Sequence, residues 1–362
     1  MTEQHEALLK ELVETHSPSG DEVLVAKCYR NAVKDYADSI RTDVMGQVDA
    51  VLNARAEAPS VLLAAHMDEL GLMVHYIDDQ GYLYVRMVGG IDAAILPGQR
   101  VDLHATGLGK GKHEVLRGVV GRRPIHLFPS DERKNVTPLK DLFIDLGLPV
   151  EEVKKRVRIG DVAHFGVGYE RFGDGLAVSR SFDDKMGVFV IARVIEELAK
   201  KKSNKGEVHC LGSTQEEIGC RGAQTAAYEI NADINIALDV SHATDYPSIN
   251  KNHYGEFKLK GGPIIGRGPN INPVLFERLV EAAEELKIPY QIQAEEDVTG
   301  TDASVLQVSR EGKATALVSV PLRYMHTPTE TIALSDLDDT IALLVKFIEN
   351  LDSSCNFIPF VD

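Results

Sequence analysis

The hydrophobic residues of the chain follow two alternating patterns. In five segments they recur at the spacing of one helix face, and in four others they form short continuous runs, as in strands buried on both faces. The helical patterns lie at residues 3–15, 21–36, 186–201, 273–287 and 335–351, and the apolar runs at residues 61–65, 208–214, 234–238 and 314–320. Because runs and helical patterns alternate, the sequence predicts an α/β domain with a helix-covered sheet.

A different pattern occupies residues 70–165, where short strand-like segments and frequent glycines replace the longer elements. We expect strands at residues 72–76, 82–87, 100–104, 115–120 and 162–165, and brief helices near residues 138–146 and 150–157. The sequence therefore predicts a β-rich domain at residues 70–165, inserted into an α/β domain formed by residues 1–69 and 166–362.

Polar residues stand where the apolar runs end. The runs lead to His66, Glu216 with Glu217, Asp239 and His326, and a fifth strand-like segment at residues 175–179 leads to Asp183. Open α/β sheets bind their ligands at the carboxyl ends of the strands, so we expect these side chains to gather in one crevice. The adjacent carboxylates of Asp183 and Asp184 repel each other unless a cation or hydrogen-bond donors compensate.

Composition and charge narrow the possible partners. The length of 362 residues fits about two domains, and a net charge of −16 disfavours nucleic acid and anionic membranes, which both need a basic surface. The N-terminal segment lacks the pattern of a signal peptide, and no apolar stretch approaches the ~20 residues of a membrane span. The four cysteines show no CxxC spacing, so we expect reduced thiols and a cytoplasmic protein.

Two histidines and three carboxylates form the predicted site, and they are His66, Asp183, Glu217, Asp239 and His326. One carboxylate can bridge two divalent ions while each ion keeps one histidine and one further carboxylate, and such ligands suit zinc or cobalt. Two ions about 3.5–4 Å apart would bind a bridging water, lower its pKa towards ~7 and polarise a carbonyl group. Glu216 could then act as general base, although spacing alone does not decide which of Glu216 and Glu217 is the ligand.

Six short motifs surround these positions. They are His66-Met67-Asp68-Glu69, Ser181-Phe182-Asp183-Asp184-Lys185, Gln215-Glu216-Glu217-Ile218-Gly219, Leu238-Asp239-Val240, Gly300-Thr301-Asp302-Ala303 and Tyr324-Met325-His326-Thr327-Pro328. Together with residues 122–127 and 141–147, they resemble the M42 family of metalloaminopeptidases, the tetrahedral (TET) peptidases. The likeness covers nearly the whole chain, and the motifs together are highly specific.

The resemblance implies a role for each metal ligand. His66 and Asp239 would hold one zinc ion. Glu217 and His326 would hold the second, and Asp183 would bridge the two. The fold implied is a zinc-peptidase-like three-layer α/β/α catalytic domain, with residues 70–165 as an inserted PDZ-like dimerisation domain. The subunits would assemble as homo-oligomers, from dimers to tetrahedral dodecamers.

The resemblance also implies roles around the metal centre. Glu216 would be the catalytic base and Asp68 would orient His66, while a cis peptide bond would join Asp183 to Asp184. Thr301 and Asp302 would lie near the substrate pocket, although they could equally cap the helix that follows.

The expected activity is hydrolysis of N-terminal residues from short peptides with a free N-terminus, since an acidic site suits an α-ammonium group. A related dinuclear-metal deacylase or carboxypeptidase is an alternative that needs an arginine for the substrate carboxylate. A glycosidase with paired carboxylates is a further alternative. However, clefts that bind polysaccharides usually stack the sugar rings on aromatic side chains. This chain has no tryptophan and only 6% aromatic residues. A non-catalytic scaffold would not need an intact ligand set. The preferred N-terminal residue stays open.

Overall fold

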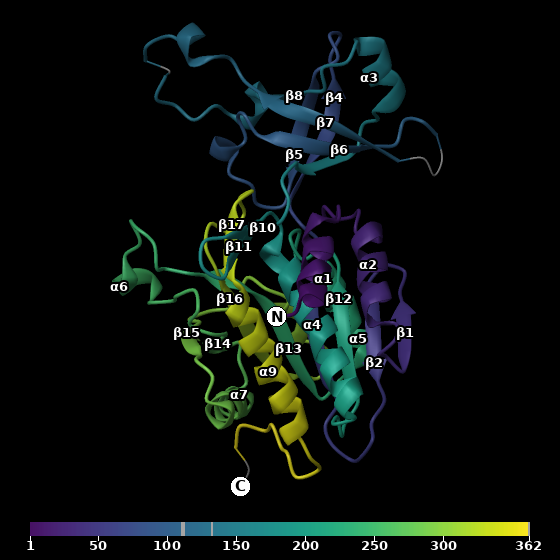
Figure 1. Cartoon of the computed structure of the whole chain (residues 1–362), viewed down its shortest axis with the longest axis vertical. Coiled ribbons are helices and arrows are strands. Elements are labelled where there is room, and N and C mark those ends of the chain that lie inside the picture. Colours follow the sequence, from purple (N-terminus) through teal and green to yellow (C-terminus); the bar gives the residue numbers. More distant parts are fainter. Residues whose placement is uncertain (110–112, 132, 361–362) are drawn as a thin grey trace.

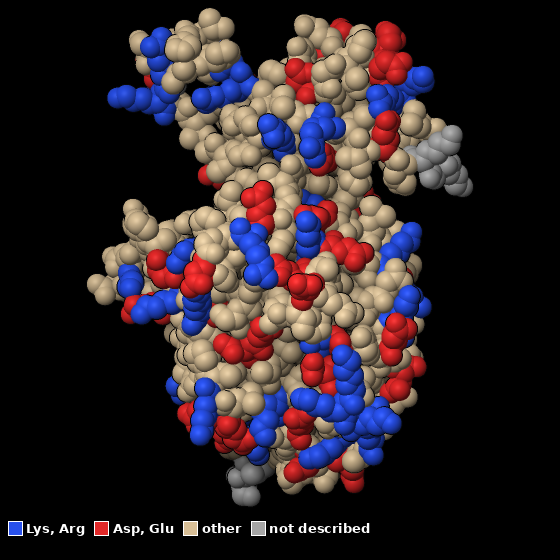
Figure 2. All heavy atoms as spheres, in the orientation of Figure 1, with Lys and Arg blue, Asp and Glu red and all other residues tan. Residues whose placement is uncertain are grey.

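The computed structural model describes residues 1–109, 113–131 and 133–360. The molecule has two parts, an upper barrel and a larger lower body, which meet at a narrow waist (Figure 1, Figure 2). The lower body is a helix-covered sheet and the upper part is built of strands, so the α/β fold with an inserted β-rich unit is confirmed. Within the described residues, no helix is both long and apolar enough to cross a membrane.

The lower body is built on an eight-stranded sheet with the order β1-β2-β12-β3-β13-β16-β14-β15. Its central strands β12, β3, β13 and β16 run parallel, so their carboxyl ends meet at one edge. All six residues of β3 are buried, as the continuous apolar run predicts. The strands are β1 (Ser39–Thr42), β2 (Val48–Leu52), β3 (Val61–His66), β12 (Val208–Ser213), β13 (Ile234–His242), β14 (Ile264–Arg267), β15 (Gln291–Ala294) and β16 (Ala314–Leu322).

Helices cover both faces of this sheet. Helix α4 packs on β3, β12 and β13, and α9 packs on β16 and α4 (Figure 1). Helix α5 packs on β12, α8 packs on β13 and β16, and these two helices pack against each other. The resulting layers are helix, sheet and helix. The helices are α1 (Glu3–Glu14), α2 (Val23–Val33), α4 (Phe182–Lys201), α5 (Arg221–Ile230), α6 (Lys251–Tyr254), α7 (Pro273–Leu286), α8 (Ala303–Gln307) and α9 (Leu334–Asn350).

The upper part is a closed barrel with the strand order β4-β5-β8-β7-β6-β9 and a hydrophobic core of its own. Its elements are β4 (Gly71–Ile77), β5 (Leu83–Val88), η1 (Ala93–Ile95), β6 (Arg100–Ala105), β7 (Glu114–Gly121), η2 (Ile125–Leu127), η3 (Leu139–Asp141), β8 (Phe143–Asp145), α3 (Val150–Arg156) and β9 (Val162–Phe165). The chain enters through β4 directly after the end of β3, so the barrel stands next to the carboxyl edge of the main sheet.

One local expectation was wrong, and one predicted strand lies in a sheet that the sequence did not specify. Residues 138–146 form the 3₁₀ turn η3 and the strand β8 instead of a helix, because β8 pairs with β5 and β7 to close the barrel. The strand before Asp183 does not belong to the main sheet. It is β11 (Leu176–Ser179), the middle of a three-stranded sheet with β10 (Glu170–Phe172) and β17 (Glu330–Ala333). The remaining strands and helices predicted above are present, with shifts of a few residues at their ends.

Candidate metal centre

The predicted site residues come together at the carboxyl edge of the main sheet. His66 ends β3, Asp239 lies in β13, and Glu217 follows β12. Asp183 lies at the start of α4, and His326 follows β16. Asp183, Glu217, Asp239 and His326 line a cavity of about 250 Å³, and His66 lies buried beside it. Five side chains from distant parts of the sequence therefore converge as expected.

Asp183 lies between the two histidines. Its Oδ1 is 3.1 Å from Nε2 of His66, and its Oδ2 is 3.3 Å from Nε2 of His326. Glu217 Oε1 lies 3.7 Å from the same nitrogen of His326. Nitrogen and oxygen atoms of His66, Asp183 and Glu217 all lie within 4.8 Å of one another, so one ion could contact them after small rotations.

The electrostatics of the cluster favour a cation. Burial and the carboxylate of Asp183 raise the pKa of Glu217 to about 9. Burial and Asp183 likewise raise the pKa of Asp239 well above its ordinary value. Oε1 of Glu217 is buried and has no hydrogen-bond partner in the part of the chain that the structure describes. Crowded carboxylates with an unused oxygen are the donor set that a hard or borderline divalent cation requires, so these residues fit such ions.

Asp68 contacts two parts of the site, His66 and the Glu216–Glu217 turn. Nδ1 of His66 donates to the backbone carbonyl of Asp68 across 3.0 Å, which leaves Nε2 free to face Asp183. The carboxylate of Asp68 lies 3.5 Å from the same Nδ1, and it accepts the backbone N–H groups of Glu216 and Glu217 at 2.9 and 3.2 Å. Asp68 does not line the cavity, and its contacts are with His66 and with the Glu216–Glu217 turn.

Two supporting groups were missed by the sequence analysis. The buried carboxylate of Glu330, in β17, accepts the backbone N–H of His326 at 2.9 Å and that of Asp183 at 3.2 Å. The carbonyl of Gly90, in the barrel, accepts Nδ1–H of His326 at 2.9 Å. Glu330 had one available signal, a carboxylate four residues after His326 at the start of an apolar segment. A backbone carbonyl such as that of Gly90 has no sequence signal.

The Asp183–Asp184 pair has the expected backbone. The peptide bond between these residues is cis, as the family resemblance implied. The side chain of Asp184 is fully buried and does not line the cavity, and it accepts the backbone N–H groups of His66 at 3.1 Å and Gly187 at 3.2 Å. Backbone hydrogen-bond donors therefore compensate the carboxylate of Asp184, whereas the carboxylate of Asp183 faces the two histidines.

The expected substrate-binding pair separates into two environments. Thr301 lines the cavity with the metal-centre residues. Asp302 lies behind it, fully buried, and accepts the hydroxyl of Ser213 at 2.6 Å. Asp302 occupies the N-cap position of α8 without a side-chain capping hydrogen bond, whereas the hydroxyl of Thr301 accepts the backbone N–H of Ala303, the first residue of α8, at 3.3 Å. One carboxylate oxygen of Asp302 lies within 4.8 Å of ligand atoms of Glu216 and Cys220.

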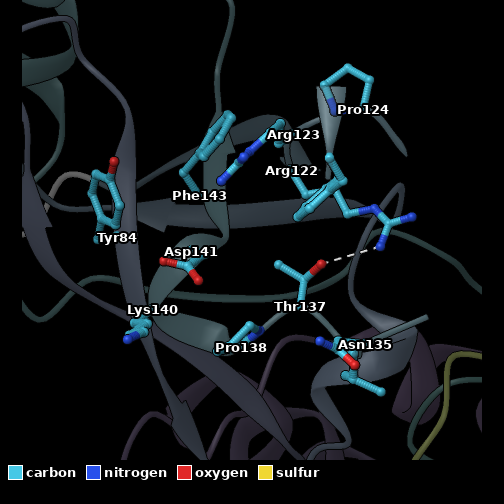
Figure 3. Close-up of a pocket in the computed structure, with 12 residues that line it drawn as sticks. Tyr84, Arg122, Arg123, Pro124, Asn135, Thr137, Pro138, Lys140, Asp141 and Phe143 are labelled. Atoms are coloured by element: carbon cyan, nitrogen blue, oxygen red, sulfur yellow. Dashed lines mark hydrogen bonds between the residues drawn. The ribbon is translucent and has the colours of Figure 1, made fainter. Parts of the chain in front are cut away.

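A larger cavity, of about 660 Å³, lies in the barrel and is separate from this cluster (Figure 3). Its walls include Tyr84, Phe143, Lys140 and Arg123, and Arg122 donates to the hydroxyl of Thr137 at 3.2 Å. The volume of a cavity alone therefore does not identify the candidate catalytic site. The smaller cavity on the main sheet contains the carboxylate and histidine cluster.

A cluster of carboxylates and histidines at the carboxyl edge of an α/β/α sheet, beside an inserted barrel, is the arrangement expected of a metal-dependent hydrolase. Residues 46–343 match the sequence profile described as M42 glutamyl aminopeptidase, and the chain belongs to the M42 peptidase family. It is a metal-dependent aminopeptidase, and the family implies divalent metal ions.

Known proteins resemble the chain along nearly its whole length. The lysyl aminopeptidase of Pyrococcus furiosus is 33% identical, over 95% of this chain and 96% of the relative. The structure of a TET aminopeptidase from the marine sediment archaeon Thaumarchaeota archaeon SCGC AB-539-E09 has a TM-score of 0.90 and 30% identity, and covers 96% of this chain and 97% of its own. The Pyrococcus horikoshii TET1 peptidase, which can assemble into a tetrahedron or a large octahedral shell, has a TM-score of 0.82 and 30% identity, over 95% and 99% of the two chains.

Proposed function

We propose that the chain hydrolyses N-terminal residues of peptides at a centre of two divalent ions. His66 and Asp239 hold one ion, Glu217 and His326 hold the other, and Asp183 serves both. The position of Asp183 carries this proposal, because its two oxygens face the two histidines at 3.1 and 3.3 Å. Zinc is the metal we propose, with cobalt as the alternative, because the donors are imidazole nitrogens and carboxylate oxygens.

Bound divalent ions supply Lewis acidity, which polarises the scissile carbonyl group. The protein supplies the proton transfer. Glu216 lines the cavity, and its Oε2 lies 3.9 Å from Nε2 of His66. Its backbone N–H is held by Asp68, so its carboxylate is directed into the cavity by a fixed turn. We assign Glu216 as the general base that accepts a proton from the attacking water and passes it to the leaving amine.

The cavity favours an aminopeptidase over the related alternatives. A carboxypeptidase or deacylase of the same fold needs a cationic side chain for the substrate carboxylate. Among the residues that line the cavity, all of them described, none is an arginine or a lysine. Carboxylates suit a substrate with a free α-ammonium group instead, and the glycosidase alternative is not favoured by the family.

The proposal extends to the assembly and its location. We propose that residues 70–165 form the dimerisation domain and that residues 1–69 and 166–362 form the catalytic domain. Homo-oligomers up to a tetrahedral dodecamer are supported by the TET1 peptidase of Pyrococcus horikoshii and by the dodecameric PhTET1-12s structure. The four cysteines are free, which suits a reducing cytoplasm.

The test uses the full chain, loaded with zinc or cobalt, and a set of aminoacyl-4-nitroanilides. Cleavage of at least one substrate is expected, with no cleavage of its N-acetylated form. Chelator should abolish the activity, and metal analysis should give two ions per subunit. Equal cleavage of the N-acetylated substrate, or full activity in a metal-free sample, would contradict the proposal.

A further inference from the structure

We propose that Glu295 makes this enzyme selective for peptides that begin with a basic residue, lysine or arginine. The inference rests on the proposed aminopeptidase function and adds the substrate class to it. Glu295 lines the same cavity as the metal-centre carboxylates but directly follows a different strand of the sheet, the edge strand β15. It is therefore placed to contact a part of the substrate other than the scissile bond.

The edge strand β15 directs Glu295 into the cavity. Residues two apart on a strand point to the same side, and Gln293 and Glu295 both line the cavity. The backbone N–H of Glu295 donates to the carbonyl of Arg267 at 2.9 Å, so strand pairing with β14 continues as far as this residue. The side-chain carbonyl of Gln293 accepts the hydroxyl of Ser241, which fixes Gln293 and leaves Glu295 as its charged neighbour.

The charge of the cavity favours a cationic side chain. Two divalent ions would offset Asp183, Glu216, Glu217 and Asp239, which leaves Glu295 as a further negative charge among the described lining residues. No ion pair joins Glu295 to a lysine or arginine in the described chain. Burial, and then Glu296, raise the pKa of Glu295 above its ordinary value, which is the mark of a carboxylate without a cation beside it.

The surroundings of Glu295 also fit the shape of a long basic side chain. The apolar side chains of Leu317, Val240 and Met325 line the cavity, where they can contact the methylene groups of lysine or arginine. A Cβ atom added at Gly266 would lie 3.7 Å from Cγ of Glu295 and 3.4 Å from Cβ of Leu317. The glutamate stem therefore packs over the floor formed by β14 and β16, with its carboxylate beyond that floor.

An acidic N-terminal residue would be rejected by the same arrangement. Its carboxylate would meet Glu295 without a lysine or arginine among the described lining residues to pair with it. Like charges placed together in a partly buried site disfavour binding, whereas a charge-assisted hydrogen bond strengthens it. Glu295 could instead bind the α-ammonium group of every substrate, and the experiment below separates the two roles.

The experiment compares lysyl- and norleucyl-4-nitroanilide, because norleucine has a similar aliphatic chain without the ammonium group. For the zinc- or cobalt-loaded enzyme, kcat/KM should be about 10- to 100-fold higher for the lysyl substrate, the effect of one charge-assisted hydrogen bond. The arginyl substrate should follow the lysyl one, and the glutamyl substrate should be the poorest. Free lysine should also inhibit more strongly than free norleucine, which reports binding without turnover.

Two variants locate the effect. Glu295→Gln should lower the ratio of lysyl to norleucyl kcat/KM about 10-fold or more, and Glu295→Lys should raise glutamyl cleavage relative to lysyl cleavage. Glu296→Gln is the matched control, since Glu296 is exposed and does not line the cavity, and it should keep the wild-type ratio.

Three outcomes would contradict these proposals. An equal loss of activity on all substrates in Glu295→Gln would place Glu295 at the α-ammonium group and overturn the selectivity proposal. Faster cleavage of glutamyl than lysyl substrate by the wild type would also overturn it. Absence of cleavage of every substrate would instead contradict the aminopeptidase function.

Discussion

The imidazole of His326 donates from Nδ1 to the backbone carbonyl of Gly90 across 2.9 Å. This bond joins a candidate metal ligand of the lower body to the barrel. It fixes the tautomer in which Nε2 faces Asp183 and Glu217. The barrel is therefore part of the support of the metal centre, in addition to any role in assembly.

Gly89→Ala should weaken the metal centre through this junction. A Cβ atom at Gly89 would lie 2.4 Å from Cδ2 of Leu70, so the side chain of Leu70 or the loop must shift, and it would lie 3.4 Å from Oε2 of Glu217, which such a shift would reach. We expect loss of part of the bound metal and about a 10-fold or greater loss of kcat/KM, as for other changes that disturb the support of metal ligands. Metal analysis and anilide assays measure both.

Gly98→Ala is the matched control for this variant. Gly98 lies in the same barrel with a φ of +87°, against +79° for Gly89, but has no atom within 4 Å of its added Cβ. Both variants thus carry the backbone strain of a left-handed alanine, and only Gly89→Ala carries the clash. Equal metal loss in the two variants would show that the junction does not support the site.

Asp68→Asn should disturb the contacts of His66 and of the Glu216–Glu217 turn. Asp68 Oδ2 accepts the hydroxyl of Ser19 at 2.6 Å and the backbone N–H of Glu217 at 3.2 Å. An amide nitrogen in that place would face two donors, at a cost of about 1–3 kcal/mol in the free energy of unfolding. We expect a lower melting temperature together with lower kcat/KM. Ser19→Ala removes one of these bonds and should cost less in both, so matching losses in the two variants would contradict the positioning role.

The candidate metal ligands could be predicted from the sequence, but some of the groups that hydrogen-bond to them could not. Apolar runs predict buried parallel strands, and the carboxyl ends of such strands share one edge, so His66, Asp239 and the Glu216–Glu217 pair could be brought together by pattern alone. Gly90 could not be found in this way, because its carbonyl belongs to the backbone. Glu295 could not be found either, since it follows a short edge strand, where a solvated glutamate is equally typical.

The barrel shows the same limit in its elements. Residues 138–146 have a helical pattern too short to distinguish from a strand, and β8 forms there because β5 and β7 offer pairing partners. The strand before Asp183 was predicted, but its sheet was not, since pairing with β10 and β17 depends on residues 170–172 and 330–333. The local sequence pattern thus predicts whether a segment forms a helix or a strand better than it predicts which strands pair with each other.

Glu216→Gln should separate metal binding from proton transfer. If Glu217 is the ligand and Glu216 the base, the variant keeps both ions and loses about 10²- to 10⁴-fold in kcat, the contribution of a general base. Glu217→Gln is the comparison, and it should lose the ion shared with His326. Loss of metal in Glu216→Gln together with retention in Glu217→Gln would mean that the two roles are exchanged. Metal analysis on the samples used for kinetics decides between these outcomes.

A group of three histidines at the waist should make the fold sensitive to acid. The ring of His16, which follows α1, stacks on that of His104 in the barrel with centroids 3.4 Å apart, and the ring of His164 lies 5.2 Å from His16. Burial, and then the nearby charge of Arg180, lower the pKa of His164 to about 3. Burial and His16 lower the pKa of His104 to about 4.

Because both pKa values lie below the 6.5 of an unfolded histidine, the native protein binds fewer protons than the unfolded chain in mild acid. The stabilisation is present above pH 6.5 and is lost as the pH falls towards 4. For buried His164, the loss between pH 7.5 and pH 5 is about 2 kcal/mol in the free energy of unfolding. Partly exposed His104 should contribute less, and Glu69 and Asp21, which face the group, oppose the effect.

His164→Asn tests this prediction, because asparagine does not titrate and can still donate to the carbonyl of Phe165, which His164 Nδ1 contacts at 2.8 Å. The fall in melting temperature between pH 7.5 and pH 5 should be smaller in His164→Asn than in the wild type, whatever the stability of the variant at pH 7.5. His75→Asn, at an exposed position on β4 of the same barrel, should keep the wild-type fall. An unchanged fall in His164→Asn would mean that other groups cause the acid sensitivity of the protein.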